Sequence, residues 1–252
     1  MNSDSGVRLE CDGPVATVTL CRPDVLNAQT PDMWRALRNF SRELTGDVRV
    51  VVVRGEGRAF SAGLDRAVFG GGDFTELAAL PDDEAAERIA GFQEAFTWLR
   101  RPDLVTIAAV QGHAIGAGFQ LALACDLRLL ADDAKLSMAE VTLGLVPDLG
   151  GTKRLVELIG YARALEVCVT GRRVAADEAA AMGLGNLVVP VAELERATRD
   201  LTAAVLAGNR DAVIEIKALL SAAADRSDAD ADRAEREAQV RRAKDLFGGT
   251  GG

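Results

Sequence analysis

The chain has 252 residues and a formal net charge of −9 at pH 7, because 29 Lys and Arg stand against 38 Asp and Glu. This balance excludes a general nucleic-acid binder and leaves no basic surface for an anionic membrane. Hydrophobic residues make up 48% of the chain, which is enough for a buried core and excludes global disorder.

The sequence also indicates where the protein is found and whether it binds metal. No apolar run approaches the length of a membrane span, and no secretory signal pattern opens the chain. The four cysteines are scattered and there is one histidine, so a zinc site has almost no ligands to draw on. We expect a cytoplasmic protein with reduced thiols, no metal and no membrane contact.

The first half of the chain predicts alternating strands and helices. Strands at 7–10 and 15–20 flank a turn and form a hairpin. Thr30 and Pro31 mark the N-cap and the first residue of a helix that carries apolar residues as far as Leu44. The further elements expected are a buried strand at 48–53, a glycine-bearing loop at 55–72, a helix at 83–99, a strand at 105–110, a small-residue turn at 112–118 leading into a helix through Cys125, and a strand at 127–130. Such alternation is typical of an α/β sheet with crossovers.

The second half of the chain is expected to be mostly helical. The helices expected there lie at 151–159, 162–170, 176–182, 192–206 and 229–247, and the only candidate strand is Val188-Val189. The last of these helices is rich in both acidic and basic residues, which is typical of a solvated face.

Two loops carry the chemical signal. Residues 58–65 follow the first buried strand, and residues 110–120 follow the strand at 105–110 and open a helix. Small residues at such turns let a ligand approach the backbone closely, and the first amides of a helix have no partner inside it. Two loops of this kind could direct two amides at one oxygen and form an oxyanion hole. Each loop alone has an equally good explanation in packing.

Together with other motifs, the loops point to a family. The run from Gly112 to Leu127, with the segments 22–28, 144–155 and 170–179 in the same order, resembles the crotonase, or enoyl-CoA hydratase/isomerase, family. The resemblance covers about residues 7–220. It implies an α/β fold, with a crotonase-type spiral of ββα units at 1–190 and a helical C-terminal trimerisation region at 191–252.

The resemblance also implies a ligand and an assembly. The substrate would be an acyl-CoA thioester whose coenzyme A is part of the substrate, with no separate cofactor. The protein would be a homotrimer, or a hexamer of two trimers. The backbone amides of Leu64 and Ala117 would hold the thioester oxygen. The other residues expected at the substrate are Val25, Ala62, Gly63, Asp65, Gly116 and Gln120.

The acid/base positions depart from the hydratase pattern. Hydratases of this family carry glutamates at the positions that match Gln120 and Glu140, and glutamine has no titratable proton to exchange. Asp148 matches a catalytic aspartate of several isomerase branches, so Glu140 and Asp148 are the predicted catalytic residues. The alternatives are that Asp148 caps the helix that follows, that Glu140 is a surface loop residue, and that Gln120 is a buried polar residue bonded to backbone.

Three other reactive residues receive a structural interpretation or none. His113 and Cys125 are interpreted as packing residues. Arg66 could contact the coenzyme A or line the acyl entrance, and the sequence does not decide between them.

Four functions remain open. The preferred one is isomerisation of an unsaturated enoyl-CoA through an oxyanion-stabilised dienolate. The second is hydration of a 2-enoyl-CoA by Glu140 with Gln120 holding the water. The third is a non-catalytic acyl-CoA-binding protein. The fourth uses Asp148 as a nucleophile, as in thioester-activated dehalogenases, and is disfavoured because Glu140 replaces an aromatic pocket wall.

Overall fold

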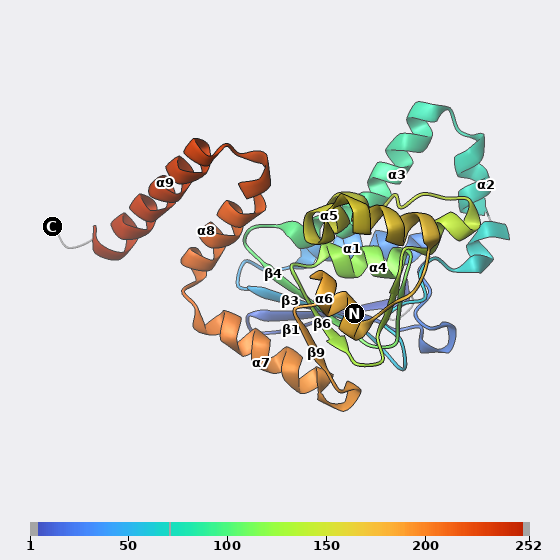
Figure 1. Ribbon diagram of the computed structural model, residues 1–252, viewed down its shortest axis with the longest axis horizontal. Helices are drawn as coiled ribbons and strands as arrows, with labels where there is room; N and C mark the ends of the chain where they lie inside the picture. Colours follow the sequence, from blue (N-terminus) through green and yellow to red (C-terminus); the bar gives the residue numbers. More distant parts are fainter. Residues whose placement is uncertain (1–4, 71, 249–252) are drawn as a thin grey trace.

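The computed structural model describes residues 5–70 and 72–248 and is organised around a six-stranded sheet (Figure 1). Its strands, in spatial order, are β1 (Val7–Asp12), β2 (Val15–Leu20), β3 (Val50–Gly55), β4 (Val105–Val110), β6 (Leu127–Ala131) and β9 (Leu187–Val189). β1 and β2 form the predicted antiparallel hairpin, with Val7 opposite Leu20, and the remaining neighbours are parallel. The predicted α/β fold is therefore confirmed.

A second, smaller sheet was not predicted. It consists of β5 (His113–Ile115), β7 (Lys135–Ser137) and β8 (Val174–Ala175). These strands have two or three residues each, too few for an alternating pattern to be recognised in the sequence. The smaller sheet matters because β5 and β7 lead directly into the candidate site.

The helices largely follow the predicted order. They are α1 (Pro31–Glu43), α2 (Gly72–Ala79), α3 (Asp82–Thr97), α4 (Ala117–Ala124), α5 (Gly151–Thr170), α6 (Ala176–Met182), α7 (Leu194–Ala207), α8 (Arg210–Ser221) and α9 (Asp228–Phe247). The Thr30 hydroxyl accepts a hydrogen bond from the Met33 amide, which confirms the predicted cap. The break expected between 159 and 162 is also present, because Gly160 has non-helical backbone angles inside α5.

Several boundaries differ from those predicted. The strand expected at 48–53 begins at Val50, because the Val48 amide bonds to Thr45 in a turn. The loop expected at 55–72 contains a short 3-10 helix, Arg66–Gly70, and the start of α2. Helix α8 was missed altogether. None of the helices in the described ranges is long and apolar enough to cross a membrane.

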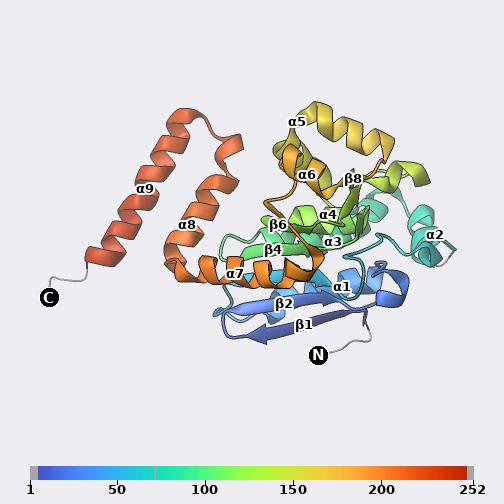
Figure 2. The same cartoon turned by 60° about the horizontal axis from the view of Figure 1, so that its bottom comes forward.

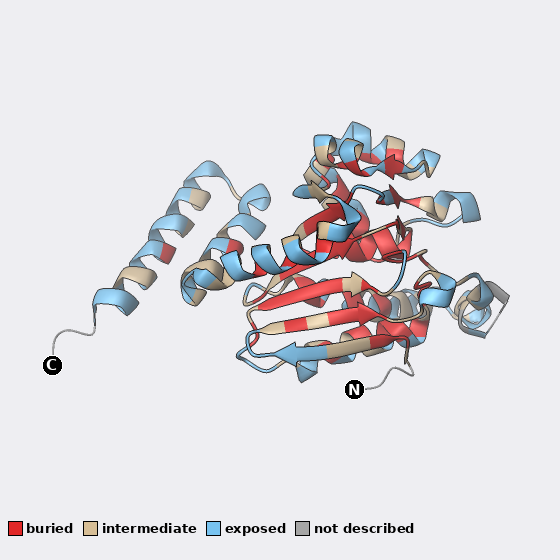
Figure 3. Ribbon diagram, turned by 90° about the horizontal axis from the view of Figure 1, so that it is seen from below, coloured by how far each residue is buried: buried red, intermediate tan, exposed pale blue. Residues whose placement is uncertain are grey.

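The central strands β3 and β4 are buried on both faces of the sheet. Val51 and Val53 point into the main core with α1, α3 and α4, whereas Val50 and Val52 face α7 in a second apolar cluster. Figure 3 shows mostly buried residues along the central strands of the sheet. Because β3 and β4 are fixed on both sides, the loops at their carboxyl ends start from rigid positions.

The last two helices extend away from the sheet (Figure 2). The buried ammonium of Lys217 on α8 bonds to the Leu104 carbonyl at 2.6 Å and to the Asp126 carboxylate at 2.7 Å. Both partners lie at the amino ends of strands, just before β4 and β6. Helix α8 is thus attached at the amino ends of the strands, opposite to the carboxyl ends that carry the two glycine loops.

Candidate active site

The two glycine loops lie against each other. Ser61 pairs with the strand β5, its amide donating to the His113 carbonyl at 2.7 Å and its carbonyl accepting from the Ile115 amide at 3.0 Å. Gly63 has φ +87°, and a side chain there would collide with the Ile115 carbonyl and place its Cβ 3.6 Å from the Ala117 amide nitrogen. Only glycine allows this approach, so the loops predicted to share one oxyanion are in direct contact.

The amides of Leu64 and Ala117 remain available. Around Leu64, the Gly63 carbonyl and the Asp65 amide bond to Gln29 on both sides, at 2.6 and 2.8 Å, and bypass the Leu64 amide. Ala117 is the first residue of α4, where an amide has no partner within the helix. In the part of the chain that the structure describes, neither amide donates to a protein acceptor.

A buried polar network supports the first loop, and sequence reasoning did not find it. The Ser61 hydroxyl donates to the Asn27 carbonyl at 2.8 Å and accepts from Gln29 at 3.1 Å. The Asn27 side chain in turn donates to the Ala59 carbonyl at 2.8 Å. The signal was present, since Asn27 belongs to the 22–28 motif that carries the resemblance.

The remaining predicted contact residues lie around this loop. The Ala62 amide donates to the Leu26 carbonyl, which brings the exposed Val25 close to it. The Asp65 carboxylate accepts from the Ala67 amide at 3.0 Å and pairs with Arg22 at 2.9 Å. These bonds, the Ala67 bond first, hold the pKa of Asp65 below its ordinary value.

The smaller sheet places Glu140 beside the second glycine loop. β5 and β7 are parallel, with Ile115 opposite Ser137, and the Gly116 amide bonds to the Ser137 carbonyl at 2.8 Å. Glu140 follows β7 in the 3-10 helix Ala139–Leu143. A Cβ built on Gly116 would lie 3.4 Å from Glu140 Oε1, so the carboxylate lies beside the residue that precedes Ala117.

Gln120 is bonded directly to Glu140. Its amide nitrogen donates to Glu140 Oε1 at 2.7 Å, and its amide oxygen accepts from the Leu149 and Gly151 amides at 2.9 and 3.2 Å. The Gln120 side chain is buried, and the hydrogen bonds described above are made to other protein groups. The sequence offered the alternative that Gln120 is a buried polar residue bonded to backbone. That holds for its amide oxygen, whereas its amide nitrogen bonds to the Glu140 side chain.

Asp148 is not a helix cap. The N-cap of α5 is Gly150, and no side chain caps that helix. The segment is held through its backbone instead, since Gln93 donates to the Asp148 carbonyl at 2.7 Å and Arg100 to the Gly150 carbonyl at 2.9 Å. Among the described residues, no side chain forms a hydrogen bond or ion pair with the Asp148 carboxylate, so this group is available.

Both carboxyl groups have pKa values above their ordinary range. Burial raises the pKa of Glu140, and the nearby Asp148 carboxylate raises it further, while the hydrogen bond from Gln120 opposes the shift. Burial also raises the pKa of Asp148. Glu140 is therefore a half-buried acid/base candidate, and the interpretation of it as a surface loop residue is wrong.

Comparisons with known proteins show which family this chain belongs to. The sequence profile of the family described as enoyl-CoA hydratase/isomerase matches residues 10–245. The chain belongs to the enoyl-CoA hydratase/isomerase family. It is 32% identical over 199 residues to a short-chain-enoyl-CoA hydratase of Clostridium acetobutylicum, covering 78% of this chain and 74% of the relative. It is 37% identical over 199 residues to a carnitinyl-CoA dehydratase of Salmonella typhi, covering 77% and 72%.

A solved structure extends the likeness to the whole fold. A Thermobifida fusca YX protein, determined in complex with acetoacetyl-CoA, shares 48% identity and a TM-score of 0.92, with 96% of each chain covered. The crotonase fold implied by the sequence is thereby confirmed.

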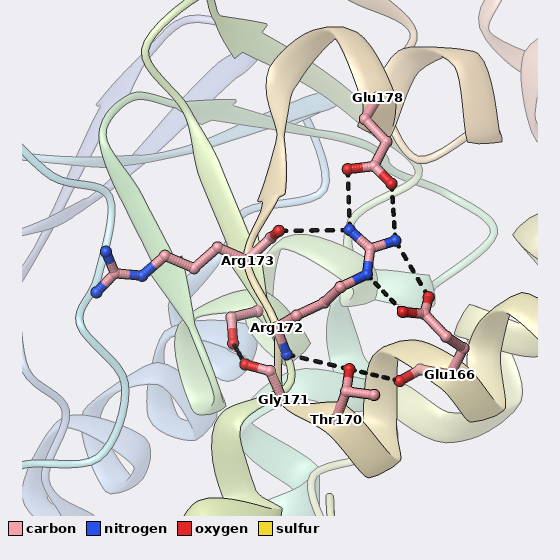
Figure 4. A network of polar contacts seen from close by, with 7 residues as sticks. Glu166, Thr170, Gly171, Arg172, Arg173 and Glu178 are labelled. Carbon is pink, nitrogen blue, oxygen red and sulfur yellow. Dashed lines mark hydrogen bonds and ion pairs between the residues drawn. The ribbon is translucent and has the colours of Figure 1, made fainter.

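A surface ion-pair network joins α5 to α6 in this family member (Figure 4). Arg172 bonds to Glu178 at 2.7 and 2.9 Å and also to Glu166, which joins the end of α5 to α6. The preceding Gly171 accepts from the Ser137 hydroxyl at 2.7 Å, and a Cβ there would lie 3.2 Å from the Val141 side chain. Gly171, next to this network, therefore contacts the two residues Ser137 and Val141 that flank the Glu140 segment.

The other reactive residues stand apart from the carboxylates. Cys125 is buried at the end of α4, where burial raises its pKa to about 12, consistent with a packing role. Burial and three nearby cations lower the pKa of His113, at the far end of β5 from Gly116. Arg66 is exposed, and the structure leaves its role undecided.

Proposed function

We propose that this protein shifts the double bond of a 3-enoyl-CoA to the 2-position. The observation that carries the proposal is the Asp148 carboxylate, which is half-buried, has no capping role and lies close enough to Glu140 to raise its pKa. Two carboxyl groups with raised pKa values beside available backbone amides suit proton transfer on a thioester-activated chain.

The chemistry requires no water. The Leu64 and Ala117 amides donate to the thioester oxygen, which increases the acidity of the α-carbon. An ionised carboxylate takes the α-proton, and the electron pair spreads over the dienolate, with the charge on the oxygen held by the two amides. A carboxyl group then returns a proton to the γ-carbon, and the double bond moves between the α- and β-carbons. Neighbouring carboxyl groups titrate in separate steps, so one can be acid while the other is base.

Hydration of a 2-enoyl-CoA is the second candidate. It is favoured by the names of relatives, such as the short-chain-enoyl-CoA hydratase, and by the presence of Glu140. The direct 2.7 Å bond between Gln120 and Glu140 weighs against it, because two side chains that hold a water between them stand further apart. A non-catalytic acyl-CoA binder is disfavoured by the two carboxyl groups with raised pKa values.

The test is a purified-protein assay with 3-enoyl-CoA and 2-enoyl-CoA in parallel. Isomerisation of the first substrate that exceeds hydration of the second supports the proposal. Efficient hydration without isomerisation overturns it in favour of the second candidate. Binding of both thioesters without turnover favours the non-catalytic alternative.

We also propose that the protein assembles as a trimer or a hexamer of two trimers. The helices α8 and α9 expose large apolar side chains, among them Ile216, Leu220, Val240 and Leu246. Such side chains gain stability when a partner surface covers them. Light scattering should give a multiple of three protomer masses, and a particle of 26.6 kDa at micromolar concentration contradicts the proposal.

A further inference from the structure

The orientation of the Gln120 side chain is determined by its surroundings. Its amide oxygen faces the N–H groups of Leu149 and Gly151, which can pair only with an acceptor. The NH₂ group must then face Glu140, as the 2.7 Å bond to Oε1 requires. Gly151 allows this arrangement, since a Cβ there would lie 2.8 Å from Gln120 Cγ.

This orientation makes the two oxygens of Glu140 unequal. Oε1 is occupied by the Gln120 donor, whereas Oε2 is buried and has no hydrogen-bond partner among the described residues. Oε2 would lie 3.8 Å from a Cβ built on Gly116, next to the predicted oxyanion amide of Ala117. An unpaired buried oxygen is costly, and a catalytic role is one of the reasons for which proteins retain such a group.

The same glutamine also holds the segment that carries Asp148. Its oxygen bonds to Leu149 and Gly151, the first directly after Asp148 and the second at the start of α5. One side chain from α4 therefore contacts Glu140 directly and Asp148 through its neighbours in the backbone.

We propose that Gln120 is a positioning residue that aligns both carboxyl groups and leaves Glu140 Oε2 as the oxygen that exchanges the proton. The inference rests on the proposed function only in assigning proton transfer to Glu140, and it applies equally to hydration. It replaces the expectation that Gln120 holds a water. It also distinguishes this chain from a two-glutamate site, in which position 120 would itself titrate.

The groups that act on Glu140 are few. Asp148, on the segment before α5, raises its pKa, and Gln120 on α4 lowers it. The half-buried Cys168 on α5 is the other titratable neighbour, and Glu140 in turn raises the pKa of its thiol. Burial and Glu140 hold the pKa of the Cys168 thiol above its ordinary value, so this thiol stays neutral at acidic pH. A change in the acidic limb of the pH profile of kcat/KM therefore reports on the carboxyl groups.

The primary variant is Gln120→Met, which keeps a similar volume and removes both hydrogen-bonding groups. Because a donor to the ionised form stabilises it, its loss should move the titration of Glu140 to higher pH. We expect kcat to fall by about 10²-fold, the cost of misplacing a catalytic group, while KM changes little. The pH dependence of kcat/KM measures the shift.

Two further variants separate the contributions. Gln93→Met releases the Asp148 carbonyl and keeps the Gln120–Glu140 bond, so it should lower kcat. Because Asp148 raises the pKa of Glu140, any shift of the Glu140 titration should be to lower pH, opposite to that in Gln120→Met. The exposed Gln239 on α9 provides the matched control, and Gln239→Glu should leave both kcat and the pH profile unchanged.

A spectroscopic readout makes the test independent of turnover. Infrared titration of the carboxyl band that disappears in Glu140→Gln should show a higher midpoint in Gln120→Met than in the parent protein. Gln120→Glu retains the shape of the side chain in case Gln120→Met fails to fold. It would place a second carboxylate at the 2.7 Å contact, so the pair should titrate in two separated steps.

The outcomes are distinct. An unchanged Glu140 midpoint in Gln120→Met, or a single unshifted step in Gln120→Glu, overturns the positioning role. Isomerase failure with intact hydration would overturn the proposed function alone, because the Glu140 midpoint and its dependence on Gln120 are measured without substrate.

Discussion

The candidate site has two halves that are built in different ways. The oxyanion half, residues 61–65 with 115–117, offers backbone amides at the ends of strands that are buried on both faces. The acid/base half, residues 139–151 with Gln120, offers side chains on a 3-10 helix and an irregular segment. The first half can perform its role with many side chains, whereas the second depends on the identity of each residue. Under the proposed function, the reaction type depends on the second half.

The largest expected effect comes from breaking the backbone half. Ala117→Pro removes the amide hydrogen, and proline is well tolerated at the first position of a helix, so the fold should be retained. Loss of one oxyanion donor costs about 10²–10³ in turnover. Steady-state kinetics and circular dichroism check this, and a folded variant with full activity shows that the Ala117 amide does not hold the oxyanion.

Breaking the side-chain half should have a comparable or smaller effect. Glu140→Gln and Asp148→Asn each remove a proton-transfer group with little change of shape. We expect each to lower isomerase turnover by about 10²-fold, within the range for general acid–base residues. The exposed Asp245 supplies the control Asp245→Asn, which should be silent. A silent Asp148→Asn would remove Asp148 from the mechanism.

The same carboxyl groups should reduce stability at neutral pH. A carboxyl whose pKa is higher in the folded state than in the unfolded state binds protons more tightly when folded. Its contribution to the free energy of unfolding is therefore largest below the unfolded pKa and is lost as pH rises through the folded pKa. Asp148→Asn should accordingly raise Tm at pH 7, and the gain should vanish near pH 4. Thermal scans across pH measure this, and a gain that grows on acidification contradicts the stated direction.

The smallest effect should come from side-chain changes in the backbone half. Leu64→Met and Ala117→Ser keep both amides, so turnover should stay close to that of the parent protein. Kinetics of the two variants beside Ala117→Pro provide the comparison. A large loss in Leu64→Met would mean that its side chain, and not only its amide, contributes to the site.

The strands and glycine loops of the backbone half could be predicted because local patterns determine them, whereas the oxyanion role of the two amides stays a prediction. Buried β-branched strands followed by glycine turns specify both the strand end and the close approach at Gly63. Thr30 and Pro31 likewise specify the start of α1 through contacts a few residues apart.

The side-chain half was predicted in composition but not in geometry. Glu140 and Asp148 were identified, yet the bond from Gln120 to Glu140 joins residues 20 positions apart and exists only after packing. The capping alternative for Asp148 failed because Gly150, two residues later, is the N-cap of α5 and no side chain caps that helix. Helix α8 was missed although a local signal was present, since the Asn209 side chain caps it by accepting from the Ala212 amide. Its attachment through the buried Lys217 is the part that only the folded structure shows.

The most direct test of the account is the ratio of two activities in the parent protein and in Asp148→Asn, measured on 3-enoyl-CoA and 2-enoyl-CoA at the same pH. The account predicts that isomerisation dominates in the parent protein and falls by about 10²-fold in the variant, with any hydration affected less. Dominant hydration in the parent protein, with Asp148→Asn unchanged on both substrates, would contradict the assignment of this site to double-bond migration.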